Sequence, residues 1–145
     1  ASGSPSMVNQ LCADLACQCV VHHLGEMPGL VDTILNEVER LGYTRKQRLG
    51  IRMALEEALV NAVKHGNRGD TNKAVQVRYQ ISETQFAVEI EDEGEGFQPE
   101  CLPDPSEPEN LARPSGRGVL LIKHYMTWVQ YSEKGNCVTM CLMRG

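Results

Sequence analysis

Apolar residues recur along this chain with two different periods, one typical of helices and one typical of strands. Between residues 30 and 41 an apolar residue stands at every third or fourth position, which predicts an amphipathic helix after a turn at 27–29. A second, longer helix is predicted from Thr44 to about Lys64, because Thr44 and Gln47 have the spacing of a capping box.

Alternation of apolar and polar residues predicts strands in much of the remaining chain. We expect these strands at 17–24, 75–81, 86–90, 128–131 and 137–143, and a short helix at 118–125. The stretch 97–116 carries five prolines and has no periodicity. Because it is too long for a simple connection in a compact domain, we expect it to be a functional lid.

The order of these elements predicts an α+β fold, a two-layer sandwich in which helices cover one face of a mainly antiparallel sheet. A chain of 145 residues fits a single domain with one core. The first six residues are small and uncharged and are followed by Met7. We therefore interpret 1–6 as a cloning remnant and 7–145 as the domain.

Composition and charge narrow the class of partner. With 14 Lys and Arg against 19 Asp and Glu, the formal net charge of −5 argues against nucleic acid. Polar residues interrupt the apolar stretch 11–24, so we expect no membrane segment and a cytoplasmic protein. The six cysteines form no Cys-x-x-Cys pair, and the adjacent His22 and His23 would point to opposite sides of a strand, so no zinc site is predicted.

Glu57 and Asn61 are the first candidates for chemistry. They stand four residues apart on the longer predicted helix, so they share one face, roughly opposite the apolar face. Such a pair is also common on a solvated helix surface and carries little weight alone.

Two glycine-rich segments follow. Asp92-Glu93-Gly94-Glu95-Gly96-Phe97 comes directly after a predicted strand, where its glycines allow a planar ligand to approach and Asp92 can accept a hydrogen bond from an exocyclic amine. It could also be a plain hairpin corner, whereas Pro99 argues against a calcium loop.

The second glycine-rich segment, Gly116-Arg117-Gly118, precedes an apolar run. Its N–H groups and guanidinium therefore suit phosphate, although such turns are often only structural.

Taken together, the three segments resemble the motifs of one superfamily. Glu57-Ala58-Leu59-Val60-Asn61-Ala62-Val63-Lys64-His65-Gly66 is similar to the N box, Asp92–Phe97 to the G1 box, and Gly116–Gly118 to the G2 box of GHKL proteins, in the same order. Within this superfamily the chain most resembles the anti-sigma-factor serine kinases of the RsbW and SpoIIAB type, over about 20–143. The resemblance implies a Bergerat-type ATP-binding fold with ATP and Mg²⁺ as its ligands.

The resemblance also implies roles for individual residues. Asn61 would coordinate the Mg²⁺ that bridges the ATP phosphates, and Glu57 would be the general base. Asp92 would pair with the adenine amino group, with Gly94 and Gly96 packed against the base.

Further positions are implied to contact the nucleotide. Lys64 and His65 would face it, and Gly116, Arg117 and Gly118 would hold the β and γ phosphates as the lid closes. Arg113 is either another phosphate contact or a solvated lid residue. The family commonly has a threonine near the adenine. That place falls on Cys137, so Thr139, two residues later on the same strand face, is the candidate for the adenine contact. The many prolines of the lid are a second departure.

For function, the resemblance implies an ATP- and Mg²⁺-dependent protein serine/threonine kinase. It would phosphorylate an anti-anti-sigma (STAS-like) partner and act as an anti-sigma factor by binding a sigma factor. Two alternatives stay open: a non-catalytic, ATP-gated protein-binding module, and a detached histidine-kinase catalytic domain. Because related proteins are often dimers, a homodimer is a further possibility.

Overall fold

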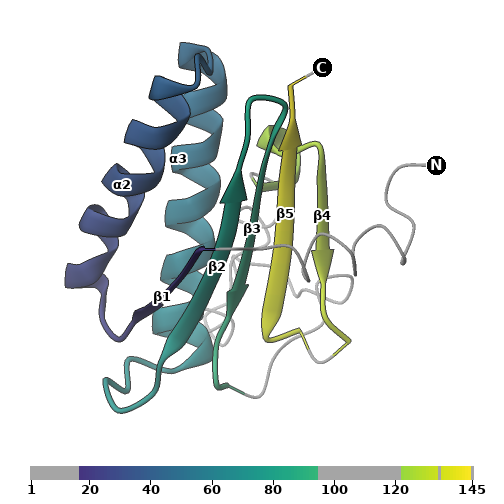
Figure 1. Ribbon diagram of the computed structural model, residues 1–145. Helices are drawn as coiled ribbons and strands as arrows, with labels where there is room; N and C mark the ends of the chain where they lie inside the picture. The colour runs from purple at the N-terminus through teal and green to yellow at the C-terminus, as the bar shows by residue number, and fades with distance from the viewer. Residues whose placement is uncertain (1–16, 95–121, 134, 145) are drawn as a thin grey trace.

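The computed structural model describes residues 17–94, 122–133 and 135–144. Two long helices lie against a five-stranded sheet with the strand order β1-β2-β3-β5-β4, and all neighbouring strands are antiparallel (Figure 1). The elements are β1 (Cys17–Val21), the 3₁₀ turn η1 (Leu24–Glu26), α2 (Met27–Arg40), α3 (Arg45–Val60), the π-helical segment η2 (Asn61–Gly66), β2 (Val75–Ile81), β3 (Gln85–Glu91), β4 (Trp128–Tyr131) and β5 (Cys137–Met143). The predicted α+β sandwich is confirmed.

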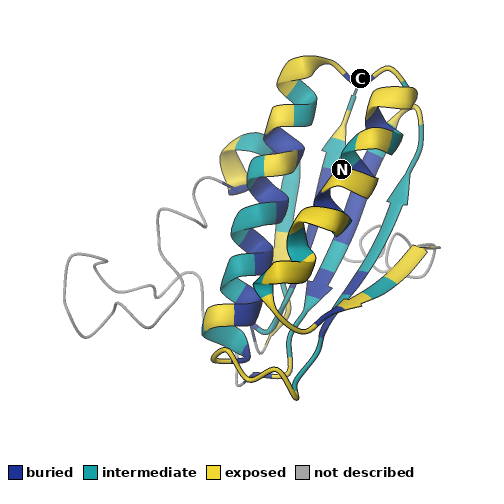
Figure 2. Cartoon of the chain, turned by 90° about the vertical axis from the view of Figure 1, so that its left-hand side faces the viewer, coloured by how far each residue is buried: buried dark blue, intermediate teal, exposed yellow. Residues whose placement is uncertain are grey.

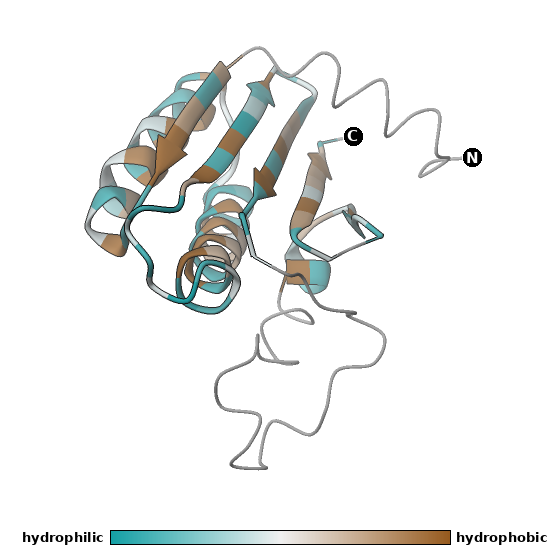
Figure 3. Ribbon diagram, turned by 90° about the horizontal axis from the view of Figure 1, so that it is seen from below, coloured by the Kyte–Doolittle hydropathy of each residue, from teal (hydrophilic) through white to brown (hydrophobic). Residues whose placement is uncertain are grey.

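One face of the sheet packs against the helices because its strands alternate. Val77, Ile90 and Val138 are register partners on three neighbouring strands, and all belong to the core. Across from them, α3 buries Leu55 and Leu59 completely. Figure 3 shows the alternating hydrophilic and hydrophobic bands along the strands, and Figure 2 shows the buried stripe that each helix turns toward the sheet. The described helices are too short or too polar to cross a lipid bilayer.

The β1–α2 connection differs from the prediction. The first strand ends at Val21 rather than at residue 24, and α2 begins at Met27, so the predicted turn at 27–29 is the first turn of the helix. Pro28 does not prevent this, because the first helical turn needs no N–H from proline and favours its backbone angle. His23 ends the extended segment by capping η1 with its side chain.

The long helix begins as predicted and ends differently. Thr44 Oγ1 accepts a hydrogen bond from Gln47 N at 3.1 Å, and Gln47 Oε1 accepts one from Thr44 N at 2.9 Å, which confirms the capping box. The α-helical part stops at Val60 and continues as the π-helical η2, which an unbroken helix to Lys64 did not anticipate. The predicted helix 118–125 is described only from residue 122, where 122–125 are helical.

Arg144 closes the end of the domain far from η2. Its guanidinium donates to the carbonyls of Leu41, Gly42 and Glu83 at 3.3, 2.6 and 2.8 Å, and it lies 4.2 Å from the centre of the Tyr43 ring. A single side chain therefore joins the end of α2, the β2–β3 turn and the last strand.

Replacing Arg144 with alanine is expected to lower the free energy of unfolding by about 2–3 kcal/mol, because several carbonyls lose a charged donor at once. Urea denaturation followed by circular dichroism measures this. The control is Arg40→Ala, which removes an exposed ion pair with Glu37 and should leave the midpoint almost unchanged. Equal midpoints for the two variants would contradict the prediction.

Candidate functional site

A cavity that is open to solvent lies between the end of α3, η2 and the neighbouring ends of β3 and β5. Three predicted site residues, Asn61, His65 and Asp92, contribute to its wall. The remaining lining residues are Ala58, Ala62, Gly66, Arg68, Ile90, Ile122, Tyr131, Gly135, Asn136, Cys137 and Val138. The structure thus brings together parts of two motifs that are separate in the sequence.

The N box and the G1 box meet at two glycines. A Cβ atom on Gly66 would lie 2.2 Å from Asp92 Oδ2, and one on Gly94 would lie 2.0 Å from the Gly66 carbonyl oxygen. Both positions therefore exclude any side chain. Gly94 N also donates to Asp92 Oδ1 at 2.7 Å, which orients the carboxylate beside the cavity.

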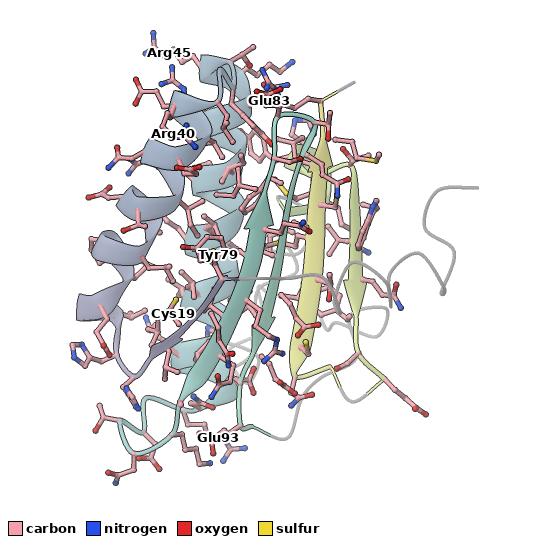
Figure 4. All side chains as sticks on the ribbon, viewed as in Figure 1. Cys19, Arg40, Arg45, Tyr79, Glu83 and Glu93 are labelled. Atoms are coloured by element: carbon pink, nitrogen blue, oxygen red, sulfur yellow. The ribbon has the colours of Figure 1, made fainter. Side chains whose placement is uncertain are left out.

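The π-helical segment lets the end of the long helix reach this contact. Asn67 N donates to Ala62 O at 2.8 Å, five residues earlier, in place of the spacing of four in an α-helix. Asn67 is buried, and its Oδ1 accepts from Glu93 N at 2.8 Å. Glu93 in turn accepts a hydrogen bond from Ala74 N through its carboxylate. Figure 4 shows Glu93 at the lower end of β3.

The turn before β5 supports Asp92 from the other side. Asp92 N donates to Asn136 O at 2.9 Å, and Asn136 Nδ2 donates to Asp92 O at 3.0 Å. Gly135 has φ 85°, a left-handed conformation that favours glycine. Both turn residues line the cavity, and neither was predicted. The Gly-Asn pair between two strands was the signal available in the sequence.

Glu57 and Asn61 keep their predicted relationship. Asn61 N donates to the carbonyl of Glu57, so the turn between them is still α-helical. Asn61 lines the cavity, whereas Glu57 is half-buried and does not. Glu57 is electrostatically coupled to Tyr131, a cavity residue on β4 that the sequence analysis missed. Burial raises the pKa of Tyr131 from 10.0 to about 12, and the negative charge of Glu57 contributes in the same direction.

This coupling predicts how Tyr131 titrates. Its folded-state pKa lies above its ordinary value, so the stability that it contributes is complete below pH 10 and is lost as the pH rises toward 12. We expect Glu57→Gln to lower the pKa of Tyr131, because the repelling carboxylate is gone while burial remains. The difference in absorbance at 295 nm between each protein and its Tyr131→Phe counterpart measures the midpoint. A titration midpoint near pH 10, or one that Glu57→Gln leaves unchanged, would contradict the prediction.

Thr139 does not line the cavity. On β5, Val138 and Met140 belong to the core beneath the helices, so Thr139 between them faces the other side of the sheet. Cys137 shares that side, yet it lines the cavity because it begins the strand beside the Gly135–Asn136 turn. The predicted contact of Thr139 with adenine therefore has no support in this geometry.

The other predicted site residues differ in position. Lys64 is exposed on η2 and does not line the cavity. Gly96, Arg113, Gly116, Arg117 and Gly118 lie outside the described residues, as do residues 1–6 and the stretch 97–116 that was predicted to be a lid. Within the described ranges, no group of three or more His, Cys, Asp or Glu side chains could hold a metal ion.

Comparison with known proteins identifies the family. Residues 23–142 match the histidine kinase-like ATPase domain. The chain belongs to this family. The predicted GHKL-type identity is thereby confirmed, and membership of an ATPase family implies that this histidine kinase-like ATPase domain binds ATP.

Curated relatives of this histidine kinase-like ATPase domain are bacterial regulators. The serine-protein kinase RsbW of Bacillus subtilis is 34% identical over 73 residues, 50% of this chain and 46% of that protein. The anti-sigma F factor of Clostridium perfringens is 31% identical over 102 residues, 67% of this chain and 71% of that protein. The RsbW of Listeria monocytogenes is 30% identical over 108 residues, 70% and 69% of the two chains. The chain thus spans less than half of the Bacillus protein, and the predicted resemblance to this type is confirmed.

Proposed function

We propose that this protein is an ATP- and Mg²⁺-dependent serine kinase that acts as an anti-sigma factor. Its substrate would be a serine hydroxyl of an anti-anti-sigma protein, and it would bind a sigma factor when that partner is absent. The observation that carries the proposal is the convergence of Asn61, His65 and Asp92 on one cavity in a histidine kinase-like ATPase domain. The printed names of the relatives support the choice of acceptor and regulatory role.

The cavity residues suit the parts of a nucleotide. At one end, the carboxylate of Asp92 is oriented by Gly94 N and is suited to accept a hydrogen bond from the adenine amino group. At the junction of α3 and η2, Asn61 offers an amide oxygen, a hard ligand of the kind that Mg²⁺ takes. Mg²⁺ usually keeps several waters and phosphate oxygens, so a site without an acidic cluster among the described residues fits it. When bound, it would neutralise phosphate charge.

Glu57 would be the general base. The serine oxygen attacks the γ-phosphorus, the bond to the β–γ bridging oxygen breaks, and ADP leaves with the electron pair. Glu57 takes the hydroxyl proton as the new bond forms. Tyr131 lies beside both the cavity and Glu57, where its neutral hydroxyl can help hold the carboxylate. Lys64 and His65 would face the nucleotide, and the Gly116-Arg117-Gly118 segment would hold its β and γ phosphates, beneath a lid at about 97–116 of a single domain 7–145.

The test is transfer of label from γ-labelled ATP with Mg²⁺ to an anti-anti-sigma protein encoded in the same genome. We expect acid-stable label on one serine of that protein, lost when the serine is replaced by alanine. Nucleotide binding without transfer would overturn the kinase and leave an ATP-gated binding module. Acid-labile label on a histidine would indicate a detached histidine-kinase catalytic domain instead.

A further inference from the structure

Arg68 lines the cavity in a conformation that needs an explanation. Its φ is 54°, and among the described residues it is the one non-glycine residue with a positive φ. A left-handed conformation is unfavourable for a residue with an ordinary side chain, so it persists only where the surroundings impose it.

The surroundings of Arg68 impose this conformation through the backbone. Asn67 N donates to Ala62 O at 2.8 Å, Gly69 N to Val63 O at 2.9 Å, and Asp70 N to Asn67 O at 3.0 Å. Asn67 is also held by its side-chain bond to Glu93 N. The residues on both sides of Arg68 are therefore bonded to η2 or to the end of β3, which fixes the direction in which its side chain leaves the chain.

The Arg68 side chain, unlike the backbone around it, makes no bond that stabilises the described part of the fold. It is exposed, and the ion pairs and side-chain hydrogen bonds among the described residues do not include it. A guanidinium at the wall of a cavity, with no ion pair to a carboxylate among the described residues, is suited to a ligand that offers an electron-rich surface.

We infer that the Arg68 guanidinium covers the purine ring of the bound nucleotide. Arg68 stands two residues after Gly66, whose backbone packs against Asp92, so it belongs to the end of the cavity assigned to adenine. Asn61 stands at the start of η2 and marks the phosphate end. A cation over the face of the aromatic base contributes cation–π and stacking attraction that does not depend on the number of phosphates. This inference rests on the proposed function, which assigns the two ends.

The experiment compares nucleotide affinities of Arg68→Asn with those of the unaltered protein by calorimetry, using AMP, ADP and ATP with Mg²⁺. Asparagine tolerates the left-handed conformation, so the variant keeps its fold and its thermal midpoint. We expect affinity to fall by about fivefold to tenfold, and by the same factor for all three nucleotides. Arg68→Lys should retain part of the affinity. The matched control is Arg45→Gln, an equal loss of charge at the opposite end of the molecule from Glu93 (Figure 4).

Two results would overturn the inference. One is unchanged affinity in Arg68→Asn, which would make Arg68 an ordinary solvated residue. The other is a loss that grows from AMP to ATP, which would make it a phosphate ligand. If the unaltered protein binds none of the three nucleotides, the proposed function itself fails, so the two failures are distinguishable.

Discussion

Replacing Glu57 with alanine is expected to reduce phosphate transfer by about 10²–10⁴-fold while leaving the affinity for ATP nearly unchanged. The reason is geometric. Glu57 does not line the cavity, but it lies one helical turn from Asn61, which does, and it is coupled to Tyr131 in the cavity wall. A base in this position acts on the incoming hydroxyl rather than on the nucleotide.

Single-turnover transfer of labelled phosphate measures the rate, and calorimetry measures ATP affinity in the same preparation. The neighbouring Glu56→Ala is the matched control, because it removes the same group from the same half-buried stretch of α3 without the four-residue spacing to Asn61. If Glu57→Ala transfers phosphate at the original rate, Glu57 is not the general base. A comparable slowing in Glu56→Ala would mean that general damage to the helix, not the loss of a base, is responsible.

Replacing Asp92 with asparagine should instead weaken nucleotide binding itself, by about 10–100-fold. Asp92 Oδ1 accepts from Gly94 N, and this bond orients the carboxylate, whose oxygens are suited to accept from an adenine amine. An amide turns one of these acceptors into a donor and leaves two donors facing each other. Titration with ATP and with ADP measures the loss, and Asp32→Asn, an exposed change on α2, is the control.

A second variant tests the same point without changing any charge. In Gly66→Ala the new Cβ would lie 2.2 Å from Asp92 Oδ2, so the carboxylate must move. We expect a loss of affinity similar to that of Asp92→Asn. Unchanged affinity for ATP and ADP in both variants would show that Asp92 does not bind the nucleotide. Equal loss of binding in Asp92→Asn and Glu57→Ala would show that the two carboxylates do not have separate roles.

Features that depend on neighbouring residues could be predicted from the sequence. The Thr44–Gln47 capping box, the limits of β2, β4 and β5 and the presence of two amphipathic helices all follow from patterns within a few residues. The start of α2 could not be predicted, because Pro28 is as typical of a turn as of a first helical turn. Proline at this position is therefore a local signal that is consistent with two different structures.

The candidate site could be predicted only in part. The N box and the G1 box were identified by their order, and Asn61, His65 and Asp92 do meet at one cavity. Tyr131 was missed because a tyrosine on an apolar strand gives no sign that a carboxylate from another element lies beside it. Arg68 was missed because its unusual backbone angle comes from hydrogen bonds that its neighbours make, not from its own residue type.

Patterns of residues close together in the chain were enough to predict the periodicity of each element, the start of the long helix and the order of the three motifs. Three other features depend on contacts between distant segments: the helix ends in a π-helical segment, Gly66 packs on Asp92, and Cys137 rather than Thr139 reaches the cavity. Close packing between distant segments leaves room for a glycine, but for no side chain, at some positions. The alternation of a strand places each residue on one of two faces, and which face is buried is known only once the core is known.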